Sequence, residues 1–149
     1  PALVQLKVDR FALKAAAGVR TDAEVSFYED GTYIAKDQGE VQITAYGLSG
    51  IPIFQISRCA AKALYYHKNA VVHLDLIPQM DQKELHGFLT KRMEQRQMLT
   101  MSKFLIGIFN QKLIPCILRY AASENRRKYR NFQKLLFPHF FMHVRIWNS

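Results

Sequence analysis

Hydrophobic and polar residues alternate along the first half of the chain, which is the pattern of strands with one face in a core. The alternating segments are residues 4–8, 23–27 and 41–43. Asp30-Gly31 separates two expected strand segments at 25–28 and 32–34, and Asp-Gly supplies the positive φ angles of a tight hairpin. A second break at residues 38–39 predicts a separate strand over 40–44. We therefore expect a meander of short antiparallel strands.

Beyond residue 50 the apolar positions change to helical spacing. Pro52 suits a first helical turn and predicts a helix over 51–65, followed by a strand over 71–76. Asp81 and Glu84 resemble a capping box that opens the next helix. Further helices are expected at 102–111, 114–122 and 125–136, and a closing strand at 140–147.

This order of elements predicts an α+β protein. A small β-barrel formed by residues 1–78 and 138–149, with a helical bundle over 79–137 inserted before the final strand, fits the order; a strictly alternating parallel sheet does not. A chain of 149 residues with 49% hydrophobic content is long enough to bury a core.

Composition narrows the class of protein. No apolar run approaches the roughly 20 residues of a membrane helix, and Cys59 and Cys116 form neither a zinc motif nor a disulfide framework. We expect a soluble protein of the reducing cytoplasm, without membrane association. The N-terminal segment lacks an initiator Met and a secretory signal, so we expect the chain to be cut from a longer protein.

The net charge of +9 is concentrated in the C-terminal third. From Lys103 onward there are nine Lys or Arg residues and one acid, Glu124. The cations of residues 126–130 alternate with an aromatic, as in RNA- or DNA-binding modules, so a basic nucleic-acid-binding barrel is the alternative function. A solvated helix face, or a face turned toward an acidic neighbouring domain, explains the same charges.

The segment most informative about function is a glycine-flanked bend at residues 44–50, between a strand and a helix. Free backbone N–H groups and the positive end of a helix dipole should converge beside Gly50, and that geometry holds an anion or a carbonyl oxygen. The alternative is that Ser49 only caps the helix and the two glycines only permit the turn.

This segment lies within a longer motif at residues 39–52, GEVQITAYGLSGIP. Together with PALV at 1–4, LDLIP at 74–78 and FLIG at 104–107, the motif resembles the insert domain of a family of bacterial NAD(P)/FAD-dependent oxidoreductases, which includes aminoacetone oxidase and a bile-acid ring reductase. The resemblance covers essentially the whole chain.

The resemblance implies a six-stranded barrel plus a helical bundle that lies over the flavin and shapes the substrate pocket. FAD would be held by the missing FAD-binding domain of the same polypeptide, with a small-molecule substrate and with no cofactor on this chain alone. By this analogy the cofactor-facing residues are Thr44, Tyr46, Gly47, Leu48, Ser49 and Gly50. Tyr46 either stacks on flavin or substrate or only packs. A structural interaction domain with no role in the pocket is a further alternative.

Several kinds of chemistry have no signal in the sequence. There is no GxG, so the dinucleotide fingerprint is missing, and Ile51 replaces the second glycine of a GxSxG nucleophile elbow. His139 and His143 lack partners for a metal site. Asp75 is either a buried functional carboxylate or a strand-end residue that pairs with backbone. We expect no catalytic residue and no metal ligand on this chain.

Overall fold

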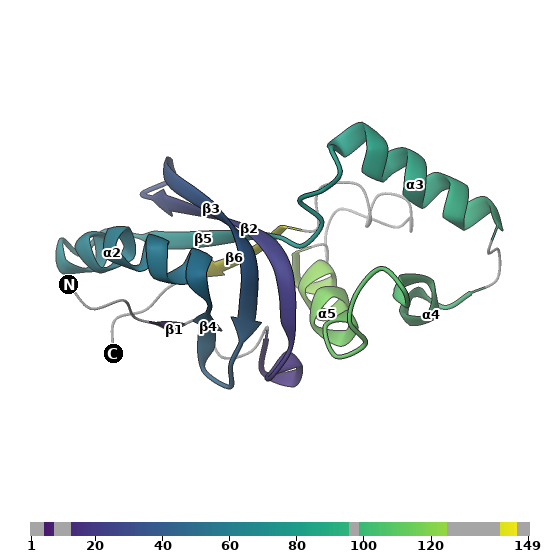
Figure 1. Ribbon diagram of the computed structural model, residues 1–149, viewed down its shortest axis with the longest axis horizontal. Coiled ribbons are helices and arrows are strands. Elements are labelled where there is room, and N and C mark those ends of the chain that lie inside the picture. Colours follow the sequence, from purple (N-terminus) through teal and green to yellow (C-terminus); the bar gives the residue numbers. More distant parts are fainter. Residues whose placement is uncertain (1–4, 8–12, 96–98, 125–140, 146–149) are drawn as a thin grey trace.

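The computed structural model describes residues 5–7, 13–95, 99–124 and 141–145. A curved sheet with helix α2 against it forms one part, and helices α3, α4 and α5 form the other (Figure 1). The strands are β1 (Leu6–Lys7), β2 (Arg20–Glu29), β3 (Thr32–Ile43), β4 (Gly47–Ser49), β5 (Ala70–Asp75) and β6 (Phe141–Arg145). The helices are η1 (Lys14–Ala16), α2 (Ile51–Tyr65), α3 (Gln82–Gln95), α4 (Met101–Leu105) and α5 (Ile114–Glu124). The α+β class is confirmed.

The six strands form one antiparallel sheet in the order β1-β4-β3-β2-β5-β6. The sheet curls like half of a barrel (Figure 1). Among the described residues β1 and β6 are not paired with each other, so the sheet is open there and the closed barrel stays a prediction. The strand order places β4, which carries residues 47–49 of the bend segment, between β1 and β3.

The β2–β3 hairpin turns where Asp-Gly predicted. Asp30 and Gly31 have φ angles of 49° and 82°, the left-handed conformation that such a turn requires. The predicted break at residues 38–39 is wrong, because β3 continues without interruption to Ile43. Gly39 lies within the strand, and a Cβ there would come 3.2 Å from Cγ of Pro52. The glycine thus allows the first turn of α2 to approach the sheet rather than ending a strand.

Helix α2 covers the inner face of the sheet and has the predicted bounds of 51–65. Its inward side chains interdigitate with the inward residues of β2 and β3 to form the core, where each fully buried aliphatic residue contributes about 1.5–3 kcal/mol. The fully or almost fully buried hydrophobic residues on these three elements are Ile53, Ile56, Ala60, Ala63, Ala23, Val25, Phe27, Val41 and Ile43.

Helix α3 begins with the predicted capping box. The Asp81 N–H donates to Glu84 Oε2 at 2.9 Å, and the Glu84 N–H donates to Asp81 Oδ1 at 2.8 Å. Only Leu89 of this helix is buried. Arg92 fastens α3 to α4, donating from Nε to the Phe104 carbonyl and from a terminal nitrogen to the Ile106 carbonyl.

The sequence pattern overestimated the length of α4 but predicted the start of α5 correctly. The helix expected at 102–111 is wrong in length, because α4 ends at Leu105 and Gly107, with a φ of 87°, begins the turns that follow. Two successive turns lead into α5, which begins at residue 114 as predicted. A helical bundle remains a prediction, since the expected helix at 125–136 lies outside the described residues.

Candidate functional site

All six residues of the candidate site lie on one continuous stretch that closes the β3–β4 hairpin and leads into α2. Thr44, Ala45 and Tyr46 form the hairpin connection, and β4 follows directly. Because β4 is three residues long, about 10 Å separates the connection from the start of α2. The stretch therefore has two distinct ends: a turn that carries Tyr46 and a helix N-terminus at Gly50.

The turn is held by the side chain of Thr44. The Thr44 N–H donates to the Gly47 carbonyl at 2.8 Å, and the Gly47 N–H donates to Thr44 Oγ1 at 3.0 Å. The same hydroxyl lies 3.1 Å from the Gly47 carbonyl, to which it donates. The side chain of Tyr46 within this turn is 56% exposed.

The two glycines are needed for packing inside the chain. A Cβ on Gly47 would lie 1.9 Å from the carbonyl oxygen of Leu6 on β1, and one on Gly50 would lie 2.4 Å from the carbonyl oxygen of Glu40 on β3. Gly50 also has a φ of 114°, which lets the chain leave β4 and enter the helix. Since the chain's own backbone fills both spaces, neither glycine forms a cradle for a cofactor phosphate.

Leu48 and Ser49 have different surroundings. Leu48 is fully buried and belongs to the core, so its side chain offers no surface to a ligand. Ser49 is 6% exposed, and within the described part of the chain its hydroxyl makes no hydrogen bond. The expectation that Ser49 caps α2 is wrong, because the N-cap is Gly50 and no side chain bonds the first turn.

The positive end of the α2 helix dipole is not offset by an acidic side chain, because the first turn of the helix contains none. The first helical hydrogen bond runs from the Phe54 N–H to the Gly50 carbonyl. Ile51, which the sequence analysis did not include among the candidate site residues, is 72% exposed in this turn. The signal in the sequence that could have indicated Ile51 is its position directly after Gly50 of the motif. The stretch thus presents one aromatic at the turn and one aliphatic at the helix start, a surface suited to contact from outside.

The other candidate groups are explained by local structure. Asp75, at the end of β5, accepts a hydrogen bond from the Ile77 N–H at 2.9 Å, so the strand-end interpretation is confirmed. His67 and His86 are exposed, as expected, and His73 lies in β5, stacked on Tyr28 with 4.2 Å between ring centroids. Across the described ranges no three His, Cys, Asp or Glu residues gather as a metal site.

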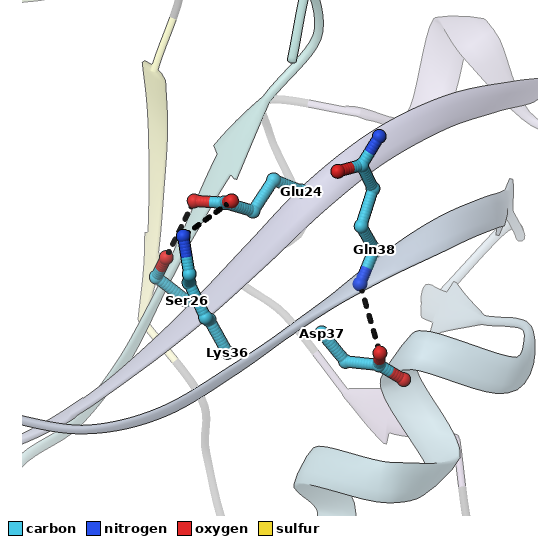
Figure 2. A network of polar contacts seen from close by, with 5 residues as sticks. All are labelled: Glu24, Ser26, Lys36, Asp37 and Gln38. Atoms are coloured by element: carbon cyan, nitrogen blue, oxygen red, sulfur yellow. Dashed lines mark hydrogen bonds and ion pairs between the residues drawn. The ribbon is translucent and has the colours of Figure 1, made fainter. Parts of the chain in front are cut away.

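The charged side chains on the outer face of the sheet pair with one another. Figure 2 shows Lys36 and Ser26 meeting the Glu24 carboxylate, with 2.8 Å from Lys36 Nζ to Oε2. This hydrogen bond raises the pKa of Lys36. Arg20 pairs with Glu40 at the same distance. Both of these cations are therefore paired with carboxylates.

The basic run at residues 126–130 lies outside the described residues, so the nucleic-acid alternative stays an untested prediction. No helix in the described ranges combines the length and the apolar character needed to cross a bilayer.

Comparison with known proteins agrees with the geometry of the fold. A 3-dehydro-bile acid delta(4,6)-reductase of Clostridium scindens is 48% identical over 121 residues, which cover 81% of this chain. The chain spans about 30% of the length of that reductase. The family description that matches residues 1–141 is the HI0933-like protein barrel and H2TH domain. The chain therefore belongs to the HI0933-like protein family and corresponds to its barrel and H2TH domain.

Proposed function

We propose that the chain is the insert domain of an FAD-dependent oxidoreductase, where it covers the flavin site and shapes the substrate pocket. The observation that carries the proposal is the 48% identity to a reductase of which this chain would form only about 30%. The remaining length of such a protein is ample for a flavin-binding domain. Family membership supports the same assignment.

Within this proposal the flavin supplies hydride or electron transfer, between a nicotinamide nucleotide or oxygen and a small substrate. The residues of this chain orient the substrate and exclude water from it. The relative is named as a reductase of a bile acid, so we propose a small, largely apolar substrate. A pocket for such a molecule needs apolar walls and few polar groups.

The turn at residues 44–47 is the part of the chain that we assign to this wall. Its exposed aromatic, Tyr46, is large, amphipathic and has few rotatable bonds, which suits stacking on a flat ring. The role that we assign to Gly47, Leu48 and Gly50 in this wall is to fix the backbone of the stretch, because these residues make their contacts inside the chain. The start of α2, with Ser49 beside it, is the end of the stretch suited to an anion or carbonyl oxygen.

The family resemblance also implies how the barrel closes and how the helices are arranged, and the composition indicates where the protein works. We propose that residues 1–78 and 138–149 complete a closed barrel, that 79–137 form a helical bundle, and that the full polypeptide works in the cytoplasm. We also propose that the isolated chain does not retain FAD, because the glycine spaces at the bend are filled by its own backbone. Equilibrium dialysis of the chain against FAD tests this last point, and retention of stoichiometric FAD would contradict it.

The assignment is tested in the full-length protein with Tyr46→Ala. We expect a rise in the substrate KM on the order of 10-fold, because the loss of one packed aromatic wall costs about 1–2 kcal/mol of binding. Tyr66→Ala is the matched control: Tyr66 is 60% exposed and lies just past the far end of α2, about 24 Å from Gly50. Equal kinetics for wild type and both variants would overturn the placement of the turn.

A further inference from the structure

The β3–β4 connection is closed by a side chain where a hairpin normally uses backbone. The two strands pair in register at Gln42 with Ser49 and at Ile43 with Leu48, which makes Thr44 and Gly47 the next opposed pair. Their backbone forms one bond, from the Thr44 N–H to the Gly47 carbonyl. The Gly47 N–H turns instead to the Thr44 hydroxyl. The hydroxyl therefore replaces a carbonyl as the partner that closes the loop.

The hydrogen bond from the Gly47 N–H to the Thr44 hydroxyl joins the two residues that flank the loop Ala45-Tyr46, so it holds both ends of that loop. On the N-terminal side, Thr44 contacts the N–H and the carbonyl of Gly47 with one oxygen. On the C-terminal side, Gly47 is buried, pairs with Lys7 of β1 and packs so closely on the Leu6 carbonyl that a Cβ would not fit. An exposed tyrosine on a loop held at both ends loses little conformational entropy when it makes a contact.

We propose that Thr44 is a positioning residue that holds Tyr46 in the orientation in which it meets the substrate or the flavin. The inference rests on the proposed function of the turn and adds the residue on which its geometry depends. Thr44 is only partly exposed, and its hydroxyl is already used by Gly47, so it acts through the loop rather than by touching the ligand.

The test uses the full-length protein with Thr44→Val, which keeps the shape of the side chain and removes the hydroxyl. We expect the substrate KM to rise about 10-fold with kcat changed less than about 3-fold, because a displaced contact group weakens binding. Thr44→Ser keeps the hydroxyl, and we expect it to restore the KM to within about 2-fold of wild type.

A double-mutant cycle with Tyr46→Ala separates positioning from a merely structural role. If Thr44 acts through Tyr46, adding Thr44→Val to Tyr46→Ala leaves the KM of the single Tyr46 variant unchanged. Additive effects, or a Thr44→Val protein with a wild-type KM, would overturn the inference. If Tyr46→Ala itself has no effect on turnover or KM, the proposed function of the turn fails, and that outcome is distinct from failure of Thr44 as its support.

Discussion

Gly47→Ala is the substitution whose effect follows most directly from the structure. The added Cβ would lie 1.9 Å from the Leu6 carbonyl oxygen and 3.1 Å from the Lys7 Cα, both backbone atoms of β1. Backbone cannot turn aside as a flexible side chain would, so β1 has to separate from β4 or the bend has to shift. If β1 separates from β4 to relieve the clash, the pairing of Leu6 with Leu48 and of Lys7 with Gly47 is lost.

The cost is estimated from what β1 contributes. Leu6 is almost fully buried, and exposing it costs about 1.5–3 kcal/mol. Each lost backbone hydrogen bond adds about 0.5–1.5 kcal/mol. Small backbone shifts relieve part of the clash, so we expect only part of this summed free energy to be lost. We therefore expect Gly47→Ala to lower the free energy of unfolding by about 2–4 kcal/mol in urea denaturation followed by far-ultraviolet circular dichroism.

Two glycine controls isolate close approach as the cause. Gly87 lies in α3 with open space around it, so Gly87→Ala should stabilise the chain by about 0.5–1 kcal/mol through helix propensity. Gly18 has a φ of 88° and also has open space, so Gly18→Ala should cost only the left-handed penalty of about 1–2 kcal/mol. A Gly47→Ala protein within about 0.5 kcal/mol of wild type would refute the reasoning.

Three further predictions concern other parts of the fold. Asp81→Ala removes the capping box of α3 and should cost about 0.5–2 kcal/mol, with faster amide exchange at the start of that helix; unchanged exchange would contradict it. Arg92→Lys loses the forked contact with the carbonyls of Phe104 in α4 and of Ile106 just after it, and should cost about 1–2 kcal/mol, measured by urea denaturation; no loss would contradict this role of Arg92. Burial raises the pKa of the Cys116 thiol above its ordinary value of 9.0, so its stabilising effect is complete below that pH and is lost as the pH rises above it. Denaturation from pH 8 to 10.5 should therefore show wild type losing more stability than Cys116→Ala, and parallel losses would contradict this.

The elements that the sequence predicted well are those determined by neighbouring residues. The hairpin turn at Asp30-Gly31 follows from the φ angles that those residues adopt. The bounds of α2 follow from helical spacing and an early proline, and the start of α3 follows from a reciprocal cap between residues three apart. In each case the interaction is local, so the pattern contains the information.

The errors arose where distant residues decide the structure. Gly39 suggested a break, but it lies in a continuous strand because Pro52 packs against it. Gly47 was interpreted as a turn residue, yet its requirement comes from β1, which is far away in the sequence. Ser49 had the composition of a cap and instead lies in a strand between two partners. The family motif drew attention to the 44–50 segment, but only the structure shows that its glycines serve packing and that its turn exposes Tyr46.

We propose that this chain covers the flavin of a larger oxidoreductase with its Thr44–Gly50 stretch. The most direct measurement is hydrogen–deuterium exchange of the full-length protein with and without FAD. We predict that FAD slows amide exchange at residues 45–51, while the far end of α2 around Tyr65 and Tyr66 is unchanged. A full-length protein that binds no FAD, or one in which FAD leaves exchange at 45–51 unaltered, would contradict the claim.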